Sequence, residues 1–357
     1  MSRSLPSVAG TVAPRRPLTQ VVINFNEQDM KHHFGDFLDR DGDYWTVIPN
    51  RERYAYTIGE ISPGSKEITI ITIGKDDENW ERIFTLPNVE EVTLHEPSKE
   101  QLEKISQLIN IKRLRITHAR PKNIEFISPL VNVEELVLEY VSGFSDLSSL
   151  QSLKKLKSLH LENLRRVKDF SGLMGIESLR YLRIDGTLDW KQPISDFEFL
   201  KGLPNLEVLS FGQVINKTEF PAFLPILSLK KLKKVKMSYA MFNAKEYALM
   251  SVGLNGVEGA NWEPYYRYAY SSIPLPRDDV RYHLPDDVIR KNHPEVTITY
   301  TGERTINNPK DEWFEFTGKG AGRAKCGSSN SESKCAEYAS LFESMKEEAR
   351  KIISLNV

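Results

Sequence analysis

The residues of this chain that could carry chemistry include a cluster of aspartates near the N-terminus. Asp39-x-Asp41-x-Asp43 has the spacing that begins a calcium-binding loop. The sixth position of such a loop should be glycine but is Tyr44, and the twelfth should be glutamate but is Asn50. We therefore predict a solvated acidic turn here and no metal site.

A second cluster, Thr317–Lys325, is rich in glycine and carries the basic residues Lys319 and Arg323. Its glycines alternate, which departs from the G-x-G-x-x-G fingerprint, and no Gly-Lys-Ser/Thr follows as in a phosphate-binding loop. Its backbone amides could meet an anion, but the composition is more typical of a flexible linker. No Ser/His/Asp or Cys/His arrangement selects a catalytic residue, so we predict a protein that is not an enzyme and needs no cofactor.

An internal repeat defines the elements that must position any functional residue. Each unit has an aliphatic residue, two variable ones, an aliphatic, one variable and an aliphatic or aromatic residue. The last residues of seven such motifs are 94, 116, 138, 161, 184, 211 and 237, so the period is 22 to 27 residues. This period predicts a solenoid. The eight motifs are Ile68-Ile71-Ile73, Val89-Val92-Leu94, Ile111-Leu114-Ile116, Val133-Leu136-Leu138, Leu156-Leu159-Leu161, Leu179-Leu182-Ile184, Leu206-Leu209-Phe211 and Leu232-Val235-Met237.

The residues between the motifs show a second periodicity. Apolar residues recur every three positions, as in Leu147, Leu150, Leu153 and Leu156. A step of three predicts 3₁₀ turns or short coils with one inward residue per turn. The motifs themselves predict short strands, whose alternation directs the aliphatic residues inward and the residues between them to the other face.

From Ile68 to Met237 the chain resembles a leucine-rich-repeat array of the short-period subclass, with units of about 22 residues, as in bacterial intracellular and effector-type proteins. "LVNVEELVLEY" and "LKSLHLENLRRVKDFSGLMGIESLRYLRI" carry the resemblance most clearly. It implies an α/β solenoid, a right-handed horseshoe with a parallel concave sheet. The family usually has an asparagine three residues after the last aliphatic residue of the strand, where its side chain bonds loop carbonyls. This asparagine is missing here, so we expect less uniform turns. Its place holds Pro97, Ala119, Val141, Leu164, Thr187, Val214 and Ala240.

The ends of a solenoid expose apolar faces and need caps, so the sequence predicts five segments. Residues 1–17 form a disordered tail and 18–66 a β-rich N-terminal cap, with strands in "LTQVVINF", "YWTVI" and "RYAYTIGEI". Residues 67–240 form the array. Residues 241–316 form a C-terminal cap with an aromatic and proline-rich segment and a final strand, and 317–357 form the glycine-rich loop and an amphipathic helix.

Two helices are predicted in the C-terminal part. The first covers Asn243–Leu254, with Asn243 as its N-cap and Glu246 completing a capping box. The second covers Glu332–Leu355, and its apolar stripe predicts an α-helical cap docked on the end of the array. A partner-binding helix is the alternative. The stripe comprises Tyr338, Leu341, Phe342, Met345, Ala349 and Ile352.

Composition limits the classes of function. Among the 357 residues, 48 basic and 49 acidic side chains leave a net charge of −1, which argues against non-specific binding of nucleic acid. No stretch reaches the roughly 20 apolar residues of a membrane span, and no secretory signal is recognisable. We expect a cytoplasmic protein with free thiols at Cys326 and Cys335, the N-terminal tail serving as an export signal if the protein is an effector.

The variable positions of the strand motifs predict a binding surface on the concave face. In the first column Glu91, Arg113 and Glu135 should form a ladder across three strands, because in-register parallel strands bring such residues side by side. Further along, an acidic edge lies beside a basic row, and this mixed, segregated face favours a protein partner with a complementary charge pattern. We therefore predict a protein–protein interaction module of the adaptor, immunity or effector type. The alternative is a ligand-binding or catalytic module in residues 255–357 around Tyr265, Tyr266, Arg267 and Lys319. The predicted partner-binding residues are Arg113, Arg115, Glu135, Val137, Glu139, His160, Glu162, Tyr181, Arg183, Asp185, Lys234 and Lys236.

Overall fold

The computed structural model describes residues 31–34, 38–41, 44–47, 53–299 and 301–356, with side chains from Ile58 onward. The predicted N-terminal tail and the strand predicted in "LTQVVINF" lie outside these residues. The chain forms two compact units. The larger comprises the described residues within Asn26–Pro264, Phe316–Ala321 and Tyr338–Val357, and the smaller comprises those within Tyr265–Glu315 and Gly322–Glu337.

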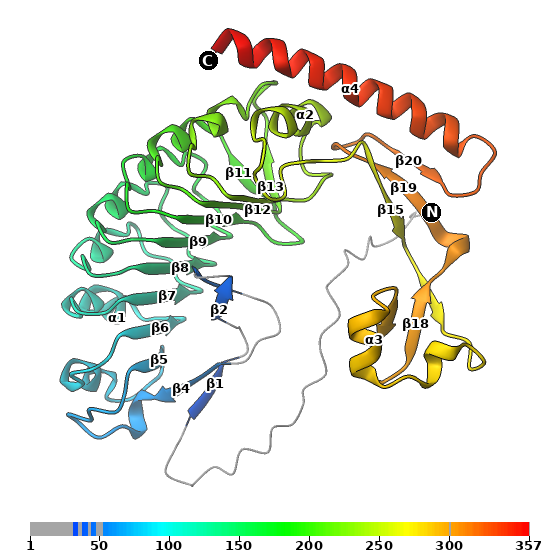
Figure 1. The fold of residues 1–357 in the computed structure, drawn as a ribbon. Helices are drawn as coiled ribbons and strands as arrows, with labels where there is room; N and C mark the ends of the chain where they lie inside the picture. Colours follow the sequence, from blue (N-terminus) through cyan, green and yellow to red (C-terminus); the bar gives the residue numbers. More distant parts are fainter. Residues whose placement is uncertain (1–30, 35–37, 42–43, 48–52, 300, 357) are drawn as a thin grey trace, which may run out of the picture. The chain divides into compact units, whose positions relative to one another are not determined.

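In the larger unit, each predicted aliphatic motif contributes one strand to a continuous sheet (Figure 1). Neighbouring strands are parallel and in register, so that Leu114, Leu136 and Leu159 are direct partners. All three are fully buried, because the alternation of each strand directs them into the solenoid. The strands are β5 (Ile70–Gly74), β6 (Glu91–His95), β7 (Arg113–Thr117), β8 (Glu135–Glu139), β9 (Ser158–Glu162), β10 (Tyr181–Asp185), β12 (Val208–Gly212) and β14 (Lys234–Lys236).

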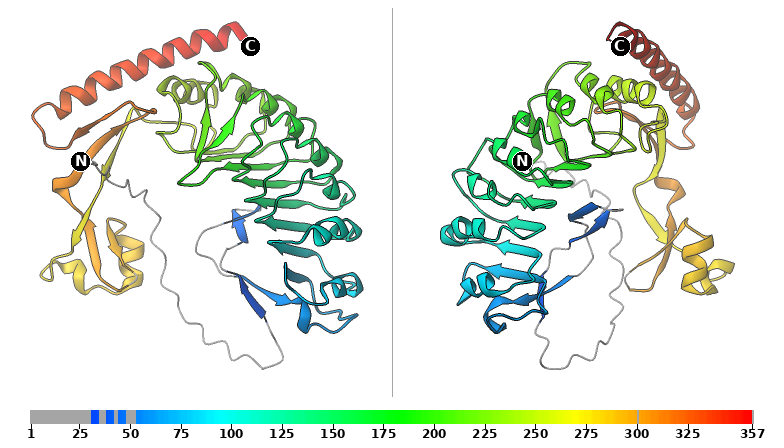
Figure 2. Two further views of the ribbon diagram at one scale, coloured as in Figure 1. Left: turned by 180° about the vertical axis from the view of Figure 1, so that it is seen from behind. Right: turned by 60° about the vertical axis from the view of Figure 1, so that its left-hand side comes forward.

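Short 3₁₀ turns cover the other side of the sheet, as the step of three predicts. Figure 2 shows these turns along the outer side of the array in two further views. Leu147, Leu150, Leu153 and Leu156 are at most 1% exposed, so one residue per turn enters the core. The fold is thus a leucine-rich-repeat solenoid. Its helical turns are η2 (Trp80–Thr85), α1 (Lys99–Lys104), η3 (Ile105–Gln107), η4 (Glu125–Ile127), η5 (Ser148–Ser152), η6 (Ser171–Leu173), η7 (Glu198–Gly202) and η8 (Leu224–Ser228).

The N-terminal strands divide between two sheets. β4 (Arg53–Thr57) lies parallel to β5 and antiparallel to β1 (Lys31–Phe34), so it extends the array sheet. β2 (Leu38–Asp41) and β3 (Tyr44–Val47) form a separate antiparallel pair. Asp39 and Asp41 of the calcium-like sequence lie on β2, whereas Asp43 and Asn50 lie outside the described residues.

The turns after the strands are more uniform than the missing asparagines suggest. The residue that directly follows each of four consecutive strands has a positive φ. These residues are Glu96 (47°), His118 (57°), Tyr140 (54°) and Asn163 (53°). The backbone N–H of each donates to the last carbonyl of the next strand, at 2.9 to 3.0 Å. This left-handed turn continues the sheet ladder for one more residue, so the prediction of irregular turns is wrong here.

Asparagines instead stabilise the loops that precede the strands. Asn88, Asn132 and Asn205 each donate from Nδ2 to a backbone carbonyl of the preceding repeat, at 2.6 to 2.8 Å. The two longer repeats use another device, since their insertions pair as β11 (Gln192–Ile194) and β13 (Val214–Asn216). Together these bonds tie consecutive repeats to one another through their loops.

The helix predicted over Asn243–Leu254 forms as α2 (Ala244–Gly253), which lies against η8. Asn243 is its N-cap and accepts from the Lys245 N–H. Glu246 does not complete a capping box, because its two carboxylate oxygens accept from the Ala222 and Phe223 N–H groups at 2.9 and 3.1 Å. The helix is thereby attached to the loop that precedes η8.

The glycine-rich segment begins as an anchored turn and ends as the strand Arg323–Lys325, rather than forming the flexible linker that its composition suggests. The Gly318 N–H donates to the Tyr239 carbonyl at 2.8 Å, and Lys319 donates to the Phe242 carbonyl at 2.5 Å. A Cβ atom at Gly318, where φ is 120°, would lie 2.7 Å from Ala244. Only glycine fits this close approach without strain.

The predicted last helix is α4 (Ser331–Asn356). In the larger unit, its residues Phe342 and Ala349 are fully buried, whereas Leu341 is 49% exposed. Lys245 of α2 pairs with Glu348 at 2.8 Å. A Cβ added at Gly253 of α2 would meet Ile353 at 3.2 Å. α4 therefore docks against α2, although Leu341 does not take part.

Apart from the predicted final strand, which falls at Val296–Ile298, the smaller unit holds strands that the aromatic, proline-rich sequence did not predict. β15 (Tyr265–Ala269), β19 (Glu312–Phe316) and β20 (Arg323–Lys325) form one sheet, although Phe316 itself groups with the larger unit. β16 (Ser272–Pro274), β17 (Val296–Ile298) and β18 (Arg304–Asn307) form another, accompanied by η9 (Val280–His283), α3 (Asp286–Asn292) and η10 (Pro309–Asp311). Leu275, Ile289 and Val296 form its buried cluster. Cys326 and Cys335 are unbridged.

Candidate partner-binding surface

The first column of the concave face forms an ion-pair ladder across three strands. Arg113 lies between Glu91 and Glu135, with its Nε 2.7 Å from Glu135 and its Nη1 3.7 Å from Glu91. The in-register pairing of β6, β7 and β8 places these side chains side by side. Both carboxylates are buried, and the arginine side chain is 29% exposed, so removing Arg113 would leave two buried carboxylates without this positive charge.

The second and third columns are also paired within the sheet. Arg115 of β7 bonds Glu139 of β8, and both side chains are at most 5% exposed. Arg183 of β10 bonds Asp185 on the same strand at 2.6 Å. His160 Nε2 lies 3.4 Å from the Glu162 carboxylate on β9. Basic and acidic groups of these two columns are therefore in contact with one another.

The middle of this face is not open to solvent. Cα atoms of β3 lie within 8 Å of Cα atoms in β8 and β9, and Figure 1 shows β2 on the side of the sheet away from the 3₁₀ turns. The expectation that the central side chains are exposed is therefore wrong. The buried members of the predicted set are Arg115, Glu135, Val137, Glu139, His160, Tyr181 and Asp185.

The other members of the predicted set keep solvent exposure. Arg113 and Glu162 are half-buried, as is Arg183, whose side chain is 26% exposed. Lys234 and Lys236 lie at the C-terminal end of the sheet and are also half-buried, and Lys234 Nζ lies 2.5 Å from Glu258. The half-buried members are thus spread along the face, from Arg113 on β7 to a basic group of Arg183, Lys234 and Lys236 at its C-terminal end.

Burial changes the protonation of the central groups. Burial raises the pKa of Glu139 even though Arg115 lowers it, and burial likewise raises the pKa of Asp185 against the effect of Arg183. For His160, burial and then the positive charge of Arg183 lower the pKa from 6.5 to about 3. The imidazole is therefore neutral in the folded protein at neutral and mildly acidic pH.

This shift predicts a pH-dependent stability. Below pH 6.5 the unfolded chain protonates His160 and the folded chain does not until about pH 3, so the free energy of unfolding falls as pH falls. The slope from this one group is about 1.4 kcal/mol per pH unit. Urea unfolding at pH 7.0 and 5.5 should therefore show a larger loss of stability for the wild type than for His160→Gln.

The control is His118→Gln, since His118 is exposed and directly follows β7, which is separated from β9 by β8. That variant should retain the full pH dependence of the wild type. The raised pKa values of Glu139 and Asp185 act in the opposite sense, but these groups are present in all three proteins. Equal slopes for wild type and His160→Gln would contradict a neutral, buried His160.

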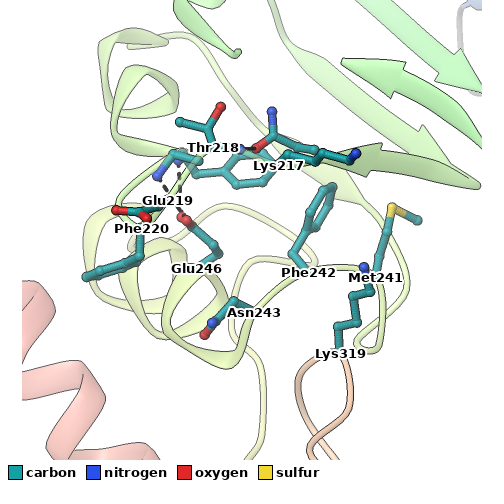
Figure 3. Close-up of a pocket in the computed structure, with 12 residues that line it drawn as sticks. Lys217, Thr218, Glu219, Phe220, Met241, Phe242, Asn243, Glu246 and Lys319 are labelled. Carbon is teal, nitrogen blue, oxygen red and sulfur yellow. Dashed lines mark hydrogen bonds between the residues drawn. The ribbon is translucent and has the colours of Figure 1, made fainter. Parts of the chain in front are cut away.

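A pocket of about 370 Å³ lies near the C-terminal end of the array (Figure 3). Phe223 and Phe242 line it together with Lys217 and Lys319, which come from separate segments. Glu246 also lines it, but the dashed bonds in Figure 3 show its carboxylate accepting from the backbone N–H groups of Ala222 and Phe223. Because both oxygens are engaged, Glu246 serves to hold the loop and is poorly placed to act as a general base.

The residues of the alternative site in 255–357 occupy different environments. Lys319 lines the pocket described above, whereas Tyr265, Tyr266 and Arg267 lie on β15. The Arg267 side chain is 64% exposed and pairs with Glu312 of β19. Among the residues with described side chains, no group of three His, Cys, Asp or Glu residues is arranged to hold a metal ion. The helices of the described part are too short or too polar to cross a membrane.

No family model matches the chain, and no curated protein matches it. Two internalins of Listeria monocytogenes are similar among the solved structures. One (inlF) is 22% identical over 52% of this chain and 52% of its own, with a TM-score of 0.36. The other, internalin C2 (inlC2), is 22% identical over 48% of this chain and 72% of its own, also with a TM-score of 0.36. The match thus spans about half the length of the first internalin.

Proposed function

We propose that this chain is a non-enzymatic interaction protein that recognises a protein partner through the concave face of its repeat array. The observation that supports this most is the accessible, charged end of that face, where Arg183, Lys234 and Lys236 project from in-register parallel strands. Rigid strands hold such groups in place before binding, which limits the conformational entropy lost on association. A matching acidic surface on the partner would complete the interaction.

β3 constrains how a partner engages this face. Since β3 lies against β8 and β9, a partner that binds with β2 and β3 in place contacts the face beyond β9. A partner that reaches Tyr181, which is fully buried, has to displace these strands first. The proposal therefore assigns recognition to the accessible end and assigns the buried centre to the stability of the array.

Charge reversal at the accessible end tests this proposal. Lys234→Glu combined with Lys236→Glu should weaken binding of the partner at least tenfold, because two favourable charges become repulsive. The partner is first identified by cross-linking and affinity capture with the wild-type chain, and its Kd is then measured by calorimetry for each variant. The loss should diminish at high salt, as for any exposed charge interaction.

The matched control reverses two lysines on the loops that precede strands β9 and β14, Lys154→Glu with Lys230→Glu. Both are exposed and neither lies on the concave face. This variant should bind the partner as the wild type does. An unchanged Kd for the Lys234 and Lys236 variant, with the control also unchanged, would show that the partner binds elsewhere.

A further inference from the structure

A second surface of the array lies at the edge where the strands end. A groove of about 520 Å³ runs along the turns that follow β5 to β9. It is distinct from the concave face, because its residues come after the strands rather than from within them. The residues that bear on its chemistry are Lys75, His118, Arg120, Tyr140, Asn163 and Arg165.

The left-handed turns arrange this groove as two rows. His118, Tyr140 and Asn163 are the first residues after β7, β8 and β9, and their N–H groups continue the sheet ladder. Arg120 and Arg165 follow two residues after the first and third of these positions. Because consecutive strands lie about 4.8 Å apart, the two arginines start about 10 Å apart along the edge.

The first row offers a flat aromatic surface. The rings of His118 and Tyr140 are stacked, with centroids 4.7 Å apart and planes within 5° of parallel. Both side chains are exposed, Tyr140 by 38%. Stacked, exposed rings of this kind bind proline rings and peptide planes in the grooves that recognise extended peptides.

The basic residues of the groove lack ion-pair partners, unlike those at the opposite edge. Where the strands begin, Lys112, Lys157 and Lys233 each contact a glutamate of the preceding repeat at 2.6 to 2.7 Å. Lys75, Arg120 and Arg165 are exposed, and within the part of the chain with described side chains none of them forms an ion pair or hydrogen bond through its charged group. Glu96 is the acidic residue that lines the groove. The groove therefore carries positive charge that its own residues do not neutralise.

Asn163 provides an independent indication of a ligand. Its side chain is buried, with 3% of the residue exposed, and it lines the groove. Its Oδ1 atom has no hydrogen-bond partner among the described residues. A buried amide oxygen without a partner is unfavourable, and an N–H group of a bound peptide would satisfy it.

We propose that this groove binds an extended acidic segment of a protein, with two carboxylates three residues apart. The carboxylates would pair with Arg120 and Arg165, a backbone N–H would donate to Asn163 Oδ1, and the intervening residues would lie over His118 and Tyr140. In a polyproline II helix, residues three apart lie on the same side and about 9.3 Å from each other, close to the separation of the two arginines. The inference rests on the proposed function in that the ligand belongs to a protein.

The test uses a fluorescein-labelled peptide, Glu-Pro-Pro-Glu-Pro-Pro-Glu, and the full chain in an anisotropy titration. The wild type should bind this peptide, and the peptide with glutamine in place of glutamate should bind at least tenfold more weakly. Arg120→Glu with Arg165→Glu should also reduce affinity at least tenfold, and Tyr140→Ala should reduce it several-fold. The control is Arg166→Glu, an exposed neighbour outside the groove, which should change affinity less than twofold.

Three results would overturn the proposal. The first is that the wild type does not bind the peptide at millimolar concentration. The second is that Arg166→Glu loses as much peptide affinity as the Arg120→Glu and Arg165→Glu variant. The third is that a single-stranded oligonucleotide of the same charge binds more tightly than the peptide. Circular dichroism checks that each variant is folded. Since the peptide is titrated without any other protein, failure of the concave face to bind a partner leaves this measurement unaffected, and the two proposals can fail separately.

Discussion

Replacing Arg115 with alanine should lower the free energy of unfolding by about 3–5 kcal/mol. The arginine is 1% exposed and pairs with Glu139, which is 4% exposed, so its removal leaves a carboxylate buried without this positive charge. Burial already raises the pKa of Glu139, and loss of Arg115 should raise it further. Urea unfolding monitored by circular dichroism measures the loss, which should shrink at acidic pH as Glu139 becomes protonated.

Two comparisons separate this charge effect from simple loss of side-chain volume. Lys157→Ala removes the exposed partner of Glu134 and should cost no more than about 1 kcal/mol. The double variant Arg115→Met with Glu139→Leu should recover most of the stability lost in Arg115→Ala, because it leaves neither charge buried. If the double variant is less stable than Arg115→Ala, the uncompensated charge is not the cause.

The second large effect is expected where α4 docks against α2. Phe342→Ala should destabilise the protein by about 3–5 kcal/mol, since a fully buried aromatic side chain is lost and a cavity remains. The Lys245–Glu348 pair and the close approach of Ile353 to Gly253 place this part of α4 against α2. Thermal unfolding and binding of a hydrophobic dye would both report an exposed end.

Leu341→Ala is the matched control, since Leu341 is adjacent to Phe342 in the same helix and is 49% exposed. It should change stability by less than about 1 kcal/mol. Equal losses for the two variants would mean that α4 contributes through helix propensity and not through docking. An unchanged melting temperature for Phe342→Ala would show that the predicted cap does not stabilise the array.

The repeat motif in the sequence was sufficient to predict most of the fold of the array. Every predicted triplet forms a strand, and the three-residue steps form 3₁₀ turns, because both patterns arise from contacts within a repeat or between adjacent repeats. The ladder of Glu91, Arg113 and Glu135 followed from register alone. The last helix was also predictable, since its apolar stripe lies at helical spacing.

The exposure of the candidate site could not be predicted in the same way. The alternating direction of side chains along a strand places His160 and Tyr181 on the side away from the core of the solenoid. It does not determine what else lies on that side. The contact of β3 with β8 and β9 joins residues more than 80 positions apart, and no local pattern encodes it. The strands of the smaller unit other than β17 were missed for a related reason, because proline-rich sequence weakens the alternation on which strand prediction depends.

The sequence by itself determined the repeating strand-and-turn unit, its period, the register of the concave columns and the charge that each column carries. Only the tertiary structure decided which of those side chains meet solvent, how left-handed turns replace the missing asparagines, and that Arg120, Tyr140, Asn163 and Arg165 line one groove. The physical reason is the separation along the sequence of the residues that make each contact. Periodicity records interactions between neighbouring repeats, whereas burial and grooves depend on contacts between segments that are distant along the chain.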